Sequence, residues 1–119
     1  MNSWIEDIHL DRTEEKTDNN QQYKMNISCS MDYNSADKRT VRFIMYFTLH
    51  SSKKYMLKAT QYTLLKFEKE ISADQAEEEM LESDAPSLFY PYIRAFAINL
   101  LSSAGYGNVL LPLVFFKEE

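Results

Sequence analysis

The residue types that most often carry out catalysis or bind metals are scarce in this chain. Its 119 residues include two histidines, His9 and His50, and one cysteine, Cys29. Their spacing matches neither the HExxH pattern of zinc proteases nor a CxxC pair, so no metal site is predicted. We expect both histidines to be outward-facing or strand-end residues. Cys29 is in phase with Met25 and Ile27, which predicts a small buried hydrophobic side chain.

Two other groups of residues could in principle bind phosphate or supply catalytic carboxylates, but neither group supports such a role. The two glycines, Gly105 and Gly107, cannot form a phosphate-binding loop. A group of acidic residues could supply catalytic carboxylates, but the solvated face of a helix explains it better. This group consists of Glu77, Glu78, Glu79, Glu82 and Asp84. We therefore predict that the protein is not an enzyme and that it uses no cofactor.

Length, charge and composition limit the class of protein. A chain of this length is expected to form one domain, residues 1–119. The net charge of −5 and the scattered basic residues argue against general nucleic-acid binding. No apolar segment approaches the roughly 20 residues of a membrane span, and the acidic N-terminus is unlike a signal peptide. A single cysteine favours the reducing cytoplasm.

Alternating apolar and polar residues predict four β-strands in the first part of the chain. The predicted strands cover residues 4–10, 23–33, 39–50 and 54–68. In the first strand, Trp4, Ile8 and Leu10 are expected on one side, with Asp7 and His9 on the other. The fourth strand has apolar residues on both sides, so its buried face stays open. The third strand is expected to bury Val41, Phe43, Met45, Phe47 and Leu49.

Helical patterns follow the strands. Ser72 is a candidate N-cap for a first helix that ends near residue 83, and acidic residues in its early turns suit the helix dipole. Pro86 should end this helix, and a second helix should start between Ser87 and Pro91 and end at the two glycines. The order predicts an α+β fold, in which a four-stranded antiparallel sheet is followed by helices packed on one face.

The second predicted helix is apolar around much of its circumference. At 100° per residue, Phe89, Ile93, Phe96 and Leu100 form one line. The opposite side is not fully polar either, since it includes Ile98. A small sheet can cover only one side of a helix, so we expect the other side to contact a second copy of the protein. The helix is predicted to be an assembly element.

More apolar residues are present than the minimal fold can bury. The fourth strand and the segment VLLPLVFF, residues 109–116, contribute most of this excess. Large apolar patches on soluble domains mark association or binding sites, and Met and Tyr side chains adapt to varied partners. Two alternatives remain open, an oligomer interface alone or an interface together with a groove for client polypeptides.

The segment LFYPYIR, residues 88–94, resembles a motif of the SecB export chaperones. In that family an LFPYAR-like motif precedes an apolar helix, which is followed by a PPxNF-like segment. Four strands with a polar loop after the first also resemble the family. The matching residues here are Leu88, Phe89, Tyr90, Pro91, Tyr92, Arg94, Pro112, Val114 and Phe116.

The resemblance implies an ATP-independent cytoplasmic holdase that keeps unfolded secretory polypeptides from aggregating and delivers them to the translocase ATPase SecA. It also implies a homotetramer, a dimer of dimers, joined through the first strands and the long helices. The expected oligomer interface is Trp4, Ile8, Phe89, Ile93, Phe96 and Leu100. The expected client-binding residues are Met25, Ile27, Met31, Tyr62, Leu110, Leu113 and Phe115.

Two departures from the family pattern change these expectations. The sequence stops at Glu119, about where the family continues into a second helix and an acidic tail, which leaves dimer and tetramer both open. Lys58 stands where the family presents an acidic residue to SecA, and this change of sign should weaken the contact. The alternative function is therefore a SecB-like chaperone dedicated to one partner, such as the antitoxin of a toxin–antitoxin system. An oligomeric scaffold without client binding is the other alternative.

Overall fold

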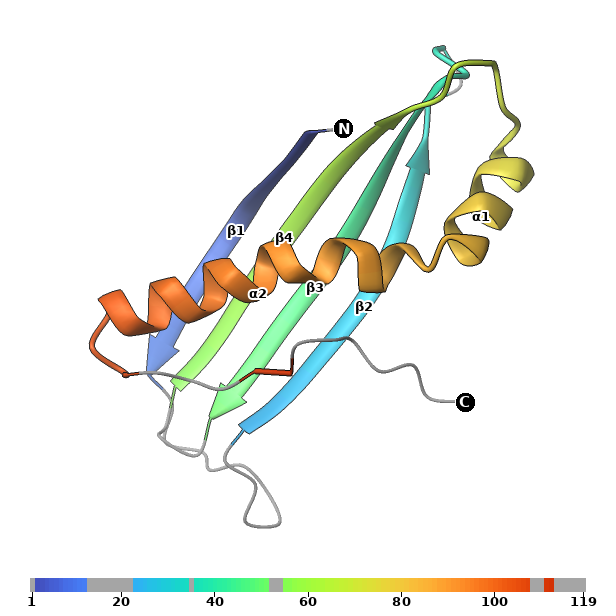
Figure 1. The fold of residues 1–119 in the computed structure, drawn as a ribbon. Helices are drawn as coiled ribbons and strands as arrows, with labels where there is room; N and C mark the ends of the chain where they lie inside the picture. Colours follow the sequence, from blue (N-terminus) through green and yellow to red (C-terminus); the bar gives the residue numbers. More distant parts are fainter. Residues whose placement is uncertain (1, 13–22, 35, 52–54, 108–110, 113–119) are drawn as a thin grey trace. The chain divides into compact units, whose positions relative to one another are not determined.

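The computed structural model describes residues 2–12, 23–34, 36–51, 55–107 and 111–112. The chain divides into two compact units, Met1–Glu70 and Ile71–Glu119. Among the described residues, the first unit consists of four strands and the second contains two helices (Figure 1). This confirms the predicted α+β order of a four-stranded antiparallel sheet followed by helices. The packing of helices on one face of that sheet, and the single domain, stay predictions.

The strands of the first unit are β1 (Asn2–Arg12), β2 (Tyr23–Tyr33), β3 (Thr40–Ser51) and β4 (Tyr55–Lys66). They pair antiparallel in the order β1-β4-β3-β2, so β1 and β2 are the two edges. β2 has the predicted bounds because its side chains alternate without interruption. The other strands differ from the prediction by one or two residues at their ends.

Most buried side chains of the sheet lie on one face, here called the core face, although Ile44 and Thr60 on the other face are also buried. All five residues that β3 was predicted to bury are at most 5% exposed, which confirms the prediction. The register pairs Leu49 with Leu57 and Met45 with Gln61, so the core face of β4 carries its odd-numbered residues. The opposite face, here called the Tyr62 face, carries Arg42, Ile44, Tyr46 and Tyr62.

The side assignment predicted for β1 is wrong. Trp4 pairs with Tyr62 on the Tyr62 face, whereas Leu10 pairs with Leu57 on the core face. The register shifts between Glu6 and His9, where Asp7 has a left-handed φ of 54°. A bulge adds one residue to a strand and reverses the phase of everything that follows it. Trp4 and Leu10 therefore point to opposite sides although both numbers are even.

Short polar side chains hold the turn between β2 and β3. The Asn34 side-chain oxygen accepts the backbone N–H groups of Ala36 and Asp37, at 3.0 and 3.1 Å. Asp37 in turn accepts the Thr40 hydroxyl at 2.8 Å and the Arg39 N–H at 3.1 Å. These hydrogen bonds lower the pKa of Asp37, the Thr40 bond contributing most. Short polar side chains thus replace backbone partners where the chain reverses.

The first helix, α1 (Ala73–Glu82), begins as predicted at Ser72. The Ser72 hydroxyl accepts the Gln75 N–H, and the Gln75 side chain accepts the Ser72 N–H, both at 3.1 Å. This reciprocal pair is a capping box, which satisfies two backbone donors at once. Ala76 and Met80 form its buried side. The acidic residues 77–79 and 82 are exposed, in agreement with a solvated face.

The second helix, α2 (Ala85–Ser103), begins earlier than predicted. Pro86 lies in its first turn, where the missing N–H has no partner to lose and the fixed φ suits a helix. The separation from α1 is made by Asp84, whose φ is 53°. The end agrees with the prediction: Tyr106 N–H reaches Leu101 O at 3.0 Å, and Gly105, at φ 90°, donates to Ser102 O.

The buried stripe of α2 differs from the predicted line. Its buried residues repeat every four positions, at Ala85, Phe89, Ile93, Ala97 and Leu101, with Tyr90 beside them. Phe96 and Leu100, which the projection placed on the central line, are half-buried. The two small alanines could not be recognised as core positions by hydrophobicity alone.

Candidate functional site

The residues predicted to bind clients do not form one surface. Met25, Ile27 and Met31 of β2 pair with Leu49, Phe47 and Phe43, which places them on the core face. Tyr62 pairs with Ile44 and lies on the opposite face. All four are half-buried. The remaining three, Leu110, Leu113 and Phe115, lie outside the described residues. Client binding by this set stays a prediction.

Cys29 differs from its expected burial. It pairs with Met45 on the core face, as its phase predicted, but its side chain is exposed. The cause is the position of β2 at an edge of the sheet, where a short side chain has a neighbouring strand on one side only. The longer side chains of Met25, Ile27 and Met31 on the same strand are half-buried.

Tyr62 is the centre of an aromatic and charged cluster on its face of the sheet. The Trp4 ring stacks on the Tyr62 ring, with centroids 5.6 Å apart and an interplanar angle of 21°. The Arg42 guanidinium lies over the same ring, 5.2 Å from its centroid. Burial raises the pKa of Tyr62, and the nearby carboxylates of Asp7 and Glu6 raise it further. From the sequence, Trp4 was predicted as an interface residue and Tyr62 as a client-binding residue, and their contact was not predicted.

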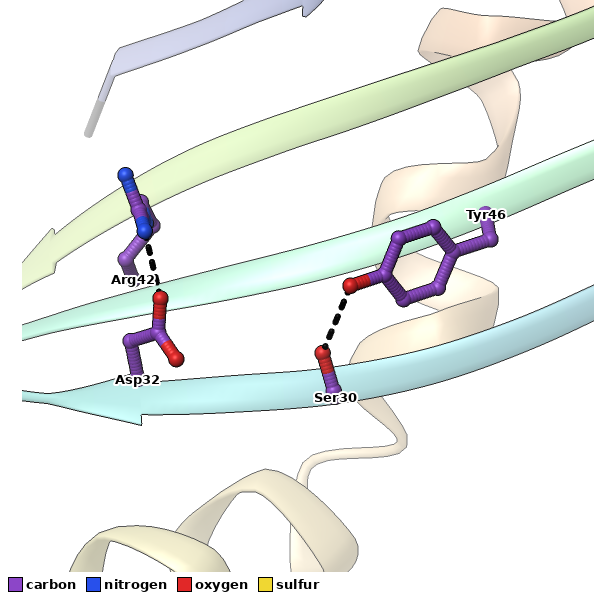
Figure 2. A network of polar contacts seen from close by, with 4 residues as sticks. All are labelled: Ser30, Asp32, Arg42 and Tyr46. Carbon is purple, nitrogen blue, oxygen red and sulfur yellow. Dashed lines mark hydrogen bonds and ion pairs between the residues drawn. The ribbon is translucent and has the colours of Figure 1, made fainter.

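Polar contacts extend this cluster toward the β2 edge. Figure 2 shows Arg42 beside Asp32, with Nη2 and Oδ2 at 2.5 Å, and Ser30 beside Tyr46, with the two hydroxyl oxygens at 3.4 Å. The hydrogen bond to Asp32 raises the pKa of Arg42. Tyr46 is 44% exposed. The cluster offers aromatic rings and a fixed cation on an accessible face, and a surface of this kind suits interaction with another macromolecule.

A hollow of about 250 Å³ lies on the first unit beside the β1 bulge. This volume is below the 300–1,000 Å³ of typical small-molecule sites. The hollow includes Lys58, the residue whose sign differs from the SecB pattern. Lys58 itself is exposed. The lining residues are Asp7, His9, Tyr46, Phe47, Thr48, Lys58, Ala59 and Thr60.

The predicted oligomer interface contains residues of very different exposure. Ile8 is 44% exposed, whereas Phe89 and Ile93 are 5% and 0% exposed in the single chain. Trp4, Phe96 and Leu100 are half-buried. Within this set, Ile8, Trp4, Phe96 and Leu100 therefore have side-chain surface left for a second copy, whereas Phe89 and Ile93 have almost none. The interface itself stays a prediction.

Two residues of the LFYPYIR segment anchor the described residues that follow the helix. The Tyr90 hydroxyl donates to the Pro112 carbonyl oxygen at 2.8 Å. Arg94, one turn further along α2, donates through Nε to the same oxygen at 3.0 Å. Arg94 also reaches the Leu111 carbonyl through Nε and Nη2, at 3.3 and 3.2 Å. The spacing of four residues places both donors on one side of the helix. This part of the motif holds the chain in position.

A buried polar group on the core face was not predicted. Gln61 of β4 is 1% exposed, and its Oε1 and Nε2 atoms have no hydrogen-bond partner in the described part of the chain. Two positions further along β4, the Thr63 hydroxyl shares a hydrogen bond of 2.9 Å with Ser3. A polar residue in a strand normally indicates the solvated face, so the sequence offered no signal for a buried amide here.

Two further kinds of site are absent from the described residues. No three or more His, Cys, Asp or Glu side chains come together there in a way that could hold a metal ion. Within the same residues, neither helix has the length and apolar character needed to cross a membrane.

Among the solved structures similar to this protein, one matches it along nearly the whole chain. It is the SecB-like chaperone Rv1957 of Mycobacterium tuberculosis in complex with a ChAD peptide from the Rv1956 HigA1 antitoxin. The TM-score is 0.64 at 16% sequence identity, covering 94% of this chain and 90% of that one. No family model matches the sequence, and no curated protein sequence matches it. At this identity the likeness shows a shared fold: the chain has the fold of a SecB-like chaperone.

Proposed function

We propose that this protein is an ATP-independent SecB-like holdase, which binds unfolded polypeptides and keeps them from aggregating. The observation that carries this proposal is the fold shared with a SecB-like chaperone over 94% of the chain. The LFYPYIR segment supports the same function independently, because its resemblance to the SecB motif rests on the sequence and not on the fold. A metal or nucleotide site is not needed for such a function, since binding energy comes from apolar contacts.

The exposed side chains of both units are consistent with this role. Large apolar residues with 44–69% of their surface exposed occur on the sheet and on both helices. Exposed apolar surface allows binding of chains of many sequences, because the hydrophobic effect is not directional. The methionines of β2 add flexible side chains that adapt to different clients. The exposed residues are Ile8, Tyr46, Leu81, Leu88 and Tyr92.

Suppression of aggregation tests the proposal directly. Several unrelated denatured proteins are diluted into buffer with and without this protein, in the absence of nucleotide, and light scattering is recorded. A holdase should suppress scattering at near-stoichiometric amounts for most of the clients. No suppression of any client would contradict a general holdase. An inert protein of similar size and charge serves as the control for crowding and ionic effects.

A second candidate function is a chaperone dedicated to an antitoxin. It is favoured by the similar solved structure, in which the chaperone is bound to an antitoxin peptide. The distinguishing experiment is titration with peptides that cover the antitoxin of a neighbouring toxin–antitoxin gene pair, compared with scrambled peptides of the same composition. Binding that needs the native peptide order indicates a dedicated chaperone, whereas equal binding of scrambled peptides indicates a general one.

Participation in export, the cytoplasmic location and the oligomeric state, dimer or tetramer, belong to the same proposal. Lys58 provides the test for export, because this exposed cation stands where the SecB pattern has an acidic residue. Lys58→Glu should strengthen binding to the host SecA, and Lys58→Gln should have a smaller effect because it only removes the charge. Equal affinities of all three proteins for SecA would argue against an export role for this surface.

A further inference from the structure

The amide of Gln61 has an unusual environment for a polar group. It lies in the middle of the core face, where its neighbours across the sheet are Ile5 of β1 and Met45 of β3. The side chain is 1% exposed, and neither amide atom has a hydrogen-bond partner in the described residues. Buried amides of folded proteins are nearly always paired, so an unpaired one requires an explanation.

Contacts among the described residues give no reason for an amide at this position. The nearby hydroxyl of Thr63 is already paired with Ser3. By the register of β3 and β4, the charged side chains of Arg42 and Lys58 lie on the opposite face of the sheet from Gln61. A methionine has nearly the same length and would bury there without a desolvation penalty. A residue that lowers stability without serving the fold is typical of a functional site.

The chemistry of the amide indicates what it would bind. A glutamine side chain presents a carbonyl acceptor and an NH₂ donor in one plane, as a peptide group does. An unfolded chain that lies on an apolar face must bury its own peptide groups, and each of these also needs a partner. We propose that Gln61 hydrogen-bonds a main-chain peptide group of the bound client, on the core face of the sheet. This inference rests on the proposed holdase function.

Such recognition would be independent of client sequence and of client charge. Every residue of a client offers a peptide carbonyl, and every residue except proline offers an N–H. An uncharged amide is also insensitive to pH and salt, in contrast to the Arg42 and Lys58 side chains of the other face. Because Gln61 is buried in the free protein, the client must displace the side chains that cover the amide. Association should therefore be slower than for a preformed open surface.

Gln61→Met tests whether the amide contributes to the stability of the fold or to client binding. The probe is a synthetic peptide of 15 residues in which leucine or phenylalanine alternates with serine, measured by calorimetry and by fluorescence anisotropy. The variant should have a higher Tm than the wild type, because an unpaired buried amide has been removed. Its affinity for the peptide should fall about ten-fold, equivalent to 1.4 kcal/mol. Met45→Leu is the control, an apolar exchange beside Gln61 that should change neither quantity much.

Peptides with one amide replaced by an ester provide a second measurement that does not depend on a folded variant. Ester replacement removes one N–H and weakens one carbonyl while leaving the side chains almost unchanged. On the wild type, ester scanning should reveal one or two positions with a loss of affinity. On Gln61→Met those positions should lose no further affinity, since the partner is already absent.

The outcomes of these experiments distinguish the proposed holdase function from the proposed role of Gln61. A wild type that binds neither the peptide nor any denatured protein overturns the holdase, and the role of Gln61 with it. Tight wild-type binding that is unchanged in Gln61→Met overturns only the role of Gln61. A lower Tm of Gln61→Met would do the same, because it would mean that the amide is paired within the fold. Equal ester losses on both proteins would also contradict a contact at Gln61.

Discussion

The strongest test of the described contacts concerns Arg94. Arg94→Met preserves a long, unbranched side chain with good helix propensity and removes the guanidinium. Three hydrogen bonds are lost, two to the Leu111 carbonyl and one to the Pro112 carbonyl. The Pro112 carbonyl keeps the hydroxyl of Tyr90 as a donor, whereas both hydrogen bonds to the Leu111 carbonyl disappear.

The expected magnitude follows from this difference between the two carbonyls. A hydrogen bond from a charged donor contributes about 1.5–3 kcal/mol to stability. The two bonds to Leu111 share one acceptor, and the acceptor at Pro112 is not left unpaired, so the cost is closer to one such bond than to three. We expect the unfolding free energy to fall by about 2 kcal/mol. For a chain of this length the Tm should fall by about 8 °C.

Thermal and urea unfolding followed by circular dichroism provide the measurement. Arg94→Lys should recover only part of the loss, because a point charge cannot reproduce the two-nitrogen fork of arginine. Asn99→Ala is the matched control, since Asn99 is exposed on the same helix. It should leave the Tm unchanged or raise it slightly through helix propensity.

A double-mutant cycle with Tyr90→Phe can refute the reasoning. Tyr90→Phe alone should cost about 1 kcal/mol, the value of a neutral hydrogen bond. Each single variant leaves the Pro112 carbonyl with one donor, but the double variant leaves it with neither. The double loss should therefore exceed the sum of the single losses by at least about 0.5 kcal/mol. Additive losses would show that Tyr90 and Arg94 do not share this acceptor in solution.

The other predictions concern capping, pH and assembly. Ser72→Ala removes the capping box of α1 and should lower the unfolding free energy by about 1 kcal/mol, with Ser72→Asp nearly neutral; equal Tm values for the alanine variant and the wild type would argue against the box. The pKa of Asp37 is lowered in the folded state, so its contribution is present above the ordinary value of 3.8 and lost as the pH falls through the lower folded pKa. Urea titrations from pH 5 to pH 2 should therefore show a flatter decline for Asp37→Asn than for the wild type, and parallel curves would contradict this. Phe96→Glu places a charge on the half-buried side of α2 and should reduce the oligomer mass by light scattering; an oligomer of unchanged mass would remove the helix from the interface.

The sequence predicted elements well wherever a regular pattern continued without interruption. β2 and β3 alternate cleanly; the bounds of β2 agree with the structure, those of β3 differ by one residue, and the core face of β3 is as predicted. Ser72 and Gly105 are local signals whose hydrogen bonds involve only near neighbours, so both helix ends that depend on them were predictable. In each case the information lies within a few residues of the feature itself.

The incorrect predictions concern features that a local sequence pattern does not determine. The β1 bulge depends on a left-handed Asp7, and aspartate is common in strand ends and turns without adopting that conformation. Pro86 is equally suited to ending one helix and starting the next, and the structure uses it for the second purpose. The exposure of Cys29 depends on the order of strands in the sheet, which alternation within one strand does not contain. Gln61 was missed because a buried unpaired amide contradicts the rule by which faces are assigned.

The predicted client-binding residues that the structure describes lie on both faces of the sheet, and this limits how a client could bind to them. Met31 and Ile27 lie on the core face at the β2 edge, whereas Tyr62 lies on the opposite face of β4, two strands away. Strands are spaced by about 4.8 Å, so these groups are about 10 Å apart across the sheet and also point in opposite directions. One extended segment cannot contact both without passing around an edge. In the proposed holdase the two groups would therefore be separate surfaces, and a client whose affinity depends on one group alone would lie on that face of the sheet.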